Sequence, residues 1–92
     1  MLLPAGTVVS LQELSKKIMI IGVCQQNAEG VPFDYSGVLW PEGFLSHDKI
    51  LLFNNDDIAK VHFCGMQDIE QLEFNGFISG KWTSEKEKRL NK

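Results

Sequence analysis

Between Lys17 and Gln25, apolar side chains stand next to one another in the sequence instead of alternating with polar ones. A strand with one covered face shows alternation, whereas a strand covered on both faces is apolar at both sets of positions. The apolar residues of this segment are Ile18, Met19, Ile20, Ile21 and Val23. The segment therefore predicts a central β-strand with structure packed against each of its faces.

Four other short segments have strand-like composition and are separated by glycine, proline and polar residues. They are Thr7–Leu11, Phe33–Trp40, Lys49–Phe53 and Ala59–Cys64. Pro41 closes the second of them, because proline has no N–H group to donate to a ladder. The polar segment Gln12–Lys16 is predicted to form a turn. Asn54–Ile58 is predicted to form a capped single turn, since its Asn and Asp side chains bond readily to nearby backbone amides.

The segment Ala59–Cys64 alternates apolar and other side chains, as in a strand with one buried face. This alternation predicts that Val61 and Phe63 point inward. It places Lys60 and His62 on the outward face.

A short helix is predicted after Gly65, capped by Gln67 or Asp68 and running to about Ile78. Its expected apolar stripe consists of Ile69, Leu72, Phe74, Phe77 and Ile78. The charged residues after Trp82 predict a frayed helix extension or a tail. We therefore expect one domain over residues 1–80 and a charged C-terminal segment over residues 81–92.

These elements predict an α+β fold that is mostly β. Five short strands suggest a small, strongly bent antiparallel sheet or an SH3-like barrel, with one C-terminal helix. An open sheet with the helix on one side is the alternative. A chain of 92 residues has room for one such domain with a thin core.

The formal net charge of −3 argues against nucleic-acid binding and against attraction to anionic membranes, because both depend on clustered basic residues. The longest apolar run, Ile18–Ile21, is too short to cross a bilayer. No secretory signal is visible, so we expect a cytoplasmic protein with reduced thiols. A disulfide between Cys24 and Cys64 stays open if their strands are neighbours.

No pattern in the sequence indicates a catalytic site, a metal site or a bound cofactor. The histidines and cysteines lack zinc-ligand spacing. His62 and Cys64 could leave one face of a strand, but a structural zinc needs about four ligands. The nucleophile elbow and glycine-rich phosphate loop are also missing. We therefore expect a protein that is not an enzyme.

Aromatic side chains beside acidic residues are the best candidates for binding another protein. Tyr35 and Trp40 are five positions apart, so a regular strand places them on opposite faces and leaves one exposed or under the helix. Glu42 follows Trp40 closely, and Trp82 stands near the end of the predicted domain. We predict that the protein-binding residues are Tyr35, Trp40, Glu42 and Trp82.

The order of five segments resembles a known family. The segments are Leu3–Val9, Lys16–Gly22, Asp34–Gly43, Phe53–Ile58 and Val61–Gly65. Together they are similar to domain of unknown function 4176, a family of small uncharacterised proteins from Gram-positive bacteria. The similarity covers residues 3 to 77. Trp40 stands where the family pattern leads us to expect tyrosine, and Asn55 where an acidic residue is more usual.

Members of this family are often encoded beside type VII secretion loci and their LXG-type toxins. The resemblance implies no enzymatic activity, and His62 and Cys64 are not part of its pattern. It leads us to expect a cytosolic accessory protein, or chaperone-like adaptor, that binds an LXG-type toxin. A toxin immunity protein that blocks a basic active site is the alternative. An exposed edge strand also allows a homodimer.

Overall fold

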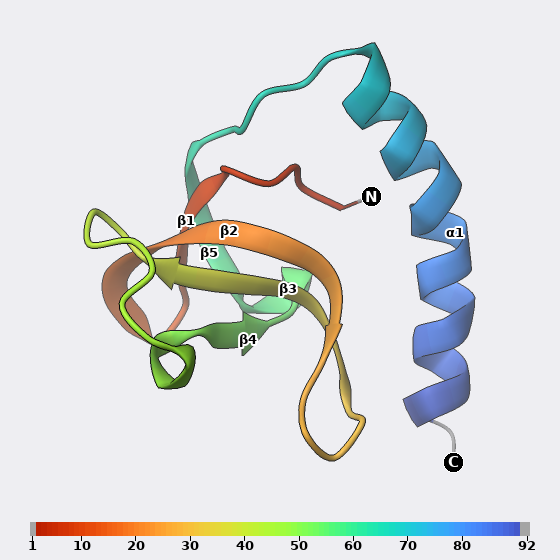
Figure 1. Cartoon of the computed structure of the whole chain (residues 1–92), viewed down its shortest axis with the longest axis horizontal. Coiled ribbons are helices and arrows are strands. Elements are labelled where there is room, and N and C mark those ends of the chain that lie inside the picture. The colour runs from red at the N-terminus through yellow and green to blue at the C-terminus, as the bar shows by residue number, and fades with distance from the viewer. Residues whose placement is uncertain (1, 91–92) are drawn as a thin grey trace.

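The apolar segment expected at the centre of the sheet is β2 (Leu14–Gln26), and it lies in the middle of five antiparallel strands. The computed structural model describes residues 2–90. The other strands are β1 (Val8–Leu11), β3 (Pro32–Leu39), β4 (Leu51–Phe53) and β5 (Ile58–Phe63). Their order in the sheet is β4-β3-β2-β1-β5, so β4 and β5 form two edges and the sheet is not closed into a barrel. The predicted α+β, mostly β class is confirmed (Figure 1).

The core lies on one side of the central strands. Val9, Ile18 and Ile20 are fully buried there. Tyr35 and Phe53 complete the centre of this core, with their ring centroids 5.5 Å apart. These residues come from four neighbouring strands, so the curvature of the sheet brings their side chains together.

Two predicted boundaries between elements need correction. Gln12–Lys16 is not wholly a turn: Leu11 pairs with Leu14, so only two residues connect β1 to β2. The strand expected from Lys49 begins at Leu51, because η1 (His47–Lys49) forms a turn of 3₁₀ helix before it. The capped turn after Phe53 is confirmed as η2 (Asn55–Asp57).

The predicted inward orientation of Val61 and Phe63 is wrong. Their side chains are 44% and 63% exposed. The reason is the position of β5, which pairs with β1 on one side and lies at the edge of the sheet on the other. The period-2 pattern correctly predicts a strand, but it does not show whether another element covers that strand.

The C-terminal helix α1 (Ile69–Leu90) is much longer than predicted. Its start is as expected, since the Asp68 carboxylate accepts the Gln71 N–H at 2.8 Å. The predicted apolar stripe is not the buried face: Ile69, Leu72, Phe74 and Phe77 are each at least half exposed. The two buried residues of α1 are instead Asn75 and Trp82.

The helix stands beside the sheet, and the N-terminal segment runs between the two (Figure 1). Asn75 anchors that segment, because its Nδ2 donates to the Leu2 carbonyl at 2.8 Å. The α1 helix is continuous across residue 80, and the division into residues 1–80 and 81–92 stays a prediction. Within residues 2–90, the structure contains no helix that combines the length and apolar character needed to cross a membrane.

Candidate functional site

The structure separates the four predicted protein-binding residues into a buried pair and a surface pair. Tyr35 is fully buried and Trp82 is 8% exposed. Trp40 is 44% exposed, and Glu42 is also at the surface, where it forms an ion pair with Lys16 at 2.7 Å. The prediction that Tyr35 and Trp82 offer surface contacts is therefore corrected, because the fold uses both rings inside the protein.

The Tyr35 hydroxyl group forms two hydrogen bonds at the edge of the core. The hydroxyl accepts the Leu3 N–H at 2.9 Å and donates to the Asn55 side chain. Burial raises the pKa of Tyr35, and the nearby Asp34 charge adds to that effect. The neutral phenol thus ties the N-terminal segment to η2, which is a structural role.

Asp34 is the buried charge that holds α1 against the sheet. Its Oδ1 accepts the Trp82 indole N–H at 3.0 Å and a Lys86 ammonium hydrogen at 2.9 Å. Its Oδ2 accepts the Asn55 backbone N–H at 2.9 Å. Burial alone would raise the pKa of Asp34, but these hydrogen bonds and the Lys86 charge outweigh burial and lower it. We call Asp34, Trp82 and Lys86 the helix clasp.

The helix clasp is not predicted by the sequence patterns described above. One signal was present: Trp82 and Lys86 are four positions apart and therefore share one side of a helix. The sequence does not show that Asp34 lies opposite them. Since the carboxylate oxygens already accept three hydrogen bonds, the helix clasp holds structure together and is not arranged as an acid–base site.

Trp40, one of the two surface residues, lines an apolar groove. This groove is on the side of the sheet away from the buried Val9 and Ile18. The groove has a volume of about 440 Å³. Its lining consists of Gly6, Val8, Lys17, Met19, Trp40, His62 and Phe63. We call it the sheet-face groove.

Strand register explains why these residues meet. Val8 lies opposite Met19 on one side and opposite Phe63 on the other. Directly opposed residues in antiparallel strands project from the same face, so these three side chains form a row across three strands. The Trp40 N–H donates to the Lys17 carbonyl at 2.9 Å, which brings the indole to the end of the same face.

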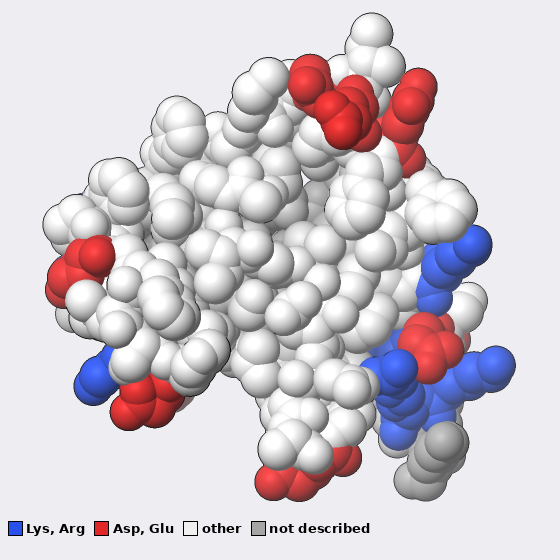
Figure 2. All heavy atoms as spheres, viewed as in Figure 1, with Lys and Arg blue, Asp and Glu red and all other residues white. Residues whose placement is uncertain are grey.

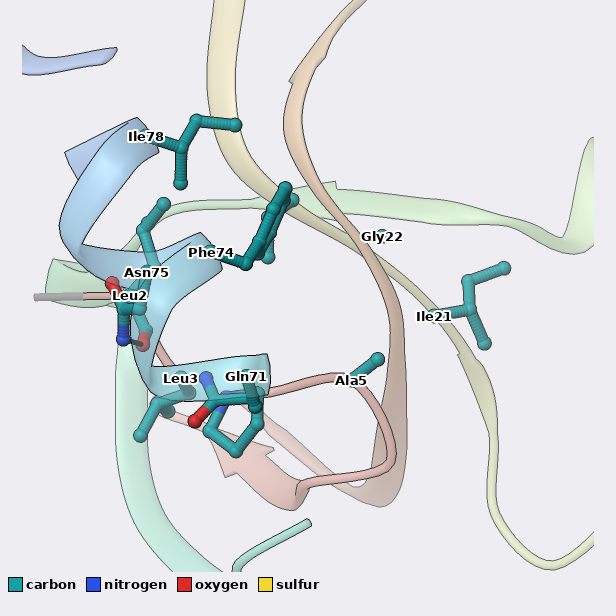
Figure 3. Close-up of a pocket in the computed structure, with 11 residues that line it drawn as sticks. Leu2, Leu3, Ala5, Ile21, Gly22, Gln71, Phe74, Asn75 and Ile78 are labelled. Carbon is teal, nitrogen blue, oxygen red and sulfur yellow. Dashed lines mark hydrogen bonds between the residues drawn. The ribbon is translucent and has the colours of Figure 1, made fainter. Parts of the chain in front are cut away.

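A second groove, of about 290 Å³, lies between α1, the N-terminal segment and β2 (Figure 3). Phe74 and Ile78 extend into it from the side of α1 that faces β2 (Figure 3). Leu2, Leu3 and Val23 add further apolar surface. This helix groove shows that α1 does not fully seal the sheet.

Charged side chains are unevenly distributed along α1. In Figure 2, acidic groups gather near its N-terminal end and basic groups around its C-terminal half. The acids near the N-terminal end are Asp68, Glu70 and Glu73. The C-terminal half contains Lys81, Lys86, Lys88 and Arg89, together with two acids, Glu85 and Glu87. The middle of the face seen in Figure 2 carries no charged side chains.

The part of the chain that the structure describes offers no group of three or more His, Cys, Asp or Glu side chains that could hold a metal ion. Cys24 and Cys64 are free thiols. Cys24 lies on β2 and Cys64 follows β5, and β1 separates these two strands in the sheet. Burial raises the pKa of the Cys24 thiol, which disfavours its reactive thiolate form.

Comparison with known proteins gives one match. The family model described as "Domain of unknown function (DUF4176)" matches residues 2–74. The match includes the whole sheet and the first turns of α1, and it ends before Trp82 and Lys86. Neither a curated protein nor a solved structure matches the chain.

Proposed function

We propose that this chain, which belongs to the DUF4176 family of domains of unknown function, acts as a non-enzymatic protein-binding module. The observation that carries this proposal is the sheet-face groove, an apolar hollow bordered by the exposed rings of Trp40 and Phe63. Contiguous exposed apolar surface on a small domain marks a site of association, because leaving it in water is unfavourable.

The groove has the features of a binding hot spot. Trp is among the residues that contribute most to binding energy when a partner covers them. The Trp40 backbone N–H donates to the Lys17 carbonyl, which fixes the main chain that carries the indole at the end of the groove. A tryptophan side chain has only two rotatable torsions, so ordering it on binding costs little conformational entropy.

The partner that we propose is an LXG-type toxin of a Gram-positive type VII secretion system. In this proposal the chain acts in the cytosol as an accessory protein or chaperone-like adaptor for the toxin. Support for this partner comes from the family resemblance. The apolar surface supports binding to a protein without specifying which one.

A native pull-down with mass spectrometry tests the adaptor proposal. The tagged chain should recover an LXG-type protein, and the double variant Trp40→Ser with Phe63→Ser should lose it. Both positions are exposed, so the variant should keep its fold, which circular dichroism checks. A matched control is Leu45→Ser with Phe44→Ser, two exposed apolar residues outside the groove lining. Recovery of the chain alone would contradict the proposal.

A second candidate function is toxin immunity, and the acidic end of α1 favours it. A surface with Asp68, Glu70 and Glu73 could cover a basic active site and slow its encounter with substrate. Co-expression separates the two functions. Rescue of growth from the toxin's C-terminal domain supports immunity, whereas binding only to its N-terminal domain supports an adaptor.

A further inference from the structure

The outer edge of β5 is open in the described part of the chain. β5 pairs only with β1, and it is six residues long. The opposite edge strand, β4, has only three residues and lies between two 3₁₀ turns. An exposed strand of this length presents unpaired N–H and C=O groups that can pair with an added strand.

The face beside this edge carries two parallel rows of side chains. The apolar row, Phe63–Val8–Met19, crosses β5, β1 and β2. The next row along β1 is centred on Ser10, which lies opposite Lys60 on β5 and opposite Lys17 on β2. An apolar row therefore lies next to a basic row, and both end at the open edge.

Among the residues that the structure describes, the two lysines of the basic row have no acidic partner. The ion pairs found among residues 2–90 involve Lys16, Lys86 and Arg89, and neither Lys17 nor Lys60 takes part in one. Both lysines are exposed. His62 adds a polar contact in this row, since its Nε2 lies 3.1 Å from Ser10 Oγ.

From this register we propose that the partner adds an extended strand to β5, with a carboxylate at the level of Lys60 and an apolar side chain at the level of Phe63. Main-chain hydrogen bonds would pair the added strand with β5. The apolar row and the basic row would select which side chains that strand carries. The inference rests on the proposed protein-binding function and specifies the chemistry of the partner segment.

The position of Lys60 argues against a second copy of this chain as the occupant. Lys60 is near the middle of β5, so pairing of β5 with itself about a two-fold axis would bring two lysines close together. Like charges on facing strands destabilise the pairing. An acidic segment from another protein avoids this repulsion and adds an attraction.

Selection from a random linear peptide library displayed on phage tests the proposal. The wild-type protein should enrich peptides that carry an acidic and an apolar residue two positions apart, since residues at this spacing project from one face of an extended strand. For the variant Lys17→Glu with Lys60→Glu, the affinity of the enriched peptides should fall about tenfold, because the charge pair at Lys60 becomes a repulsion and the whole basic row becomes acidic. The matched control is Lys81→Glu with Lys88→Glu on α1, which should leave their affinity unchanged.

The binding position is then read from amide NMR shifts of the full chain with an enriched peptide. Shifts centred on β5 support the proposal. The variant Phe63→Ala should also lower the affinity of the enriched peptides, and this loss should not depend on salt concentration. Shifts centred on the helix groove, or equal binding by the Lys17→Glu, Lys60→Glu variant, would overturn strand addition while leaving the protein-binding function standing. A library that enriches no peptide would also overturn strand addition to β5. The pull-down described above would still test the protein-binding function independently.

Analytical ultracentrifugation tests the remaining alternative, in which a second copy of the chain pairs with the β5 edge. If the wild-type chain is a dimer that Phe63→Asp dissociates, the occupant of the β5 edge is a second copy and the acidic-partner proposal fails. A monomer at the concentrations used for peptide binding agrees with the proposal.

Discussion

At the scale of single residues, buried polar groups decide which surfaces of this protein stay closed. Asp34 is 7% exposed, yet it is a charged group in the middle of a strand. Three hydrogen bonds, one of which is also the ion pair with Lys86, compensate its loss of water. Because two of these partners come from α1, the position of the helix depends on one carboxylate.

The lowered pKa of Asp34 predicts loss of stability in acid. An unfolded chain protonates aspartate near pH 4. The ionised group therefore stabilises the fold above about pH 4, and this contribution disappears as the pH falls through the lower folded-state pKa. Urea unfolding at a series of pH values measures it. Asp34→Asn should lose about 3 kcal/mol at neutral pH and show a weaker acid dependence. Equal acid dependence in both proteins would contradict this role.

Gly37 is predicted to tolerate no side chain. A Cβ atom there would lie 2.5 Å from Ile18 Cγ2 and 3.1 Å from Phe53 Cε1, inside the core. We expect Gly37→Ala to lower the free energy of unfolding by about 1–3 kcal/mol through overpacking. Gly76→Ala is the matched control, because open space surrounds that helical position and alanine should stabilise it by about 1 kcal/mol. Denaturant unfolding of both variants measures the difference, and a stable Gly37→Ala protein would contradict the packing.

At the scale of elements, α1 is held by few contacts for its length. Its buried residues, Asn75 and Trp82, are seven positions apart, and the exposed apolar side chains lie elsewhere on the helix. Such a helix gains little from amphipathic packing. The second half of α1 therefore depends on the helix clasp, although Lys, Glu and Arg residues there favour helix by themselves.

Shortening α1 tests this dependence and the division of the chain at residue 80. A chain ending at Gly80 lacks Trp82 and Lys86, so we expect its free energy of unfolding to fall by about 3–5 kcal/mol, the usual cost of removing a buried tryptophan. A chain ending at Arg89 retains both residues and should match the full chain. Thermal unfolding followed by circular dichroism compares the three. Equal stability of all three would show that residues 81–92 are a dispensable tail.

At the scale of the whole molecule, one thin core serves both the sheet and the helix. Trp82 belongs to the same buried cluster as Ile18, Tyr35 and Phe53. Small domains of this kind unfold in one step when their elements share a core. The exposed apolar surfaces lie outside this cluster, on the sheet face and along α1.

This shared core predicts that the sheet and the helix unfold together. In a Trp40→Phe variant, Trp82 is the single tryptophan and reports the contact between α1 and the sheet. Its fluorescence and the far-ultraviolet circular dichroism should give coincident urea transitions. The reverse variant, Trp82→Phe, provides the control, with Trp40 reporting the sheet face. Loss of the Trp82 signal at lower urea would show that α1 undocks first.

Local sequence patterns predict the five strands to within a few residues, the central place of β2 and the capped turns. These follow from local rules, namely side-chain periodicity, proline without an N–H, and Asn and Asp bonding to nearby amides. The sequence left open which of Tyr35 and Trp40 is exposed, and the structure exposes Trp40. Burial of Trp82 and exposure of Phe63 could not be predicted in this way, because both depend on which element covers a residue.

Only the tertiary structure decided which aromatic rings are available to a partner. Tyr35 and Trp40 look equivalent in one aromatic strand, yet the first is fully buried and bonded to Leu3 and Asn55, while the second stays 44% exposed. Strand register also aligns Ser10 with two lysines. Lys60 is fifty positions from Ser10 in the sequence, and Lys17 is seven positions from it. The pairing of Ser10 with Lys60 joins segments fifty positions apart, and the pattern within one segment does not show which distant segment pairs with it.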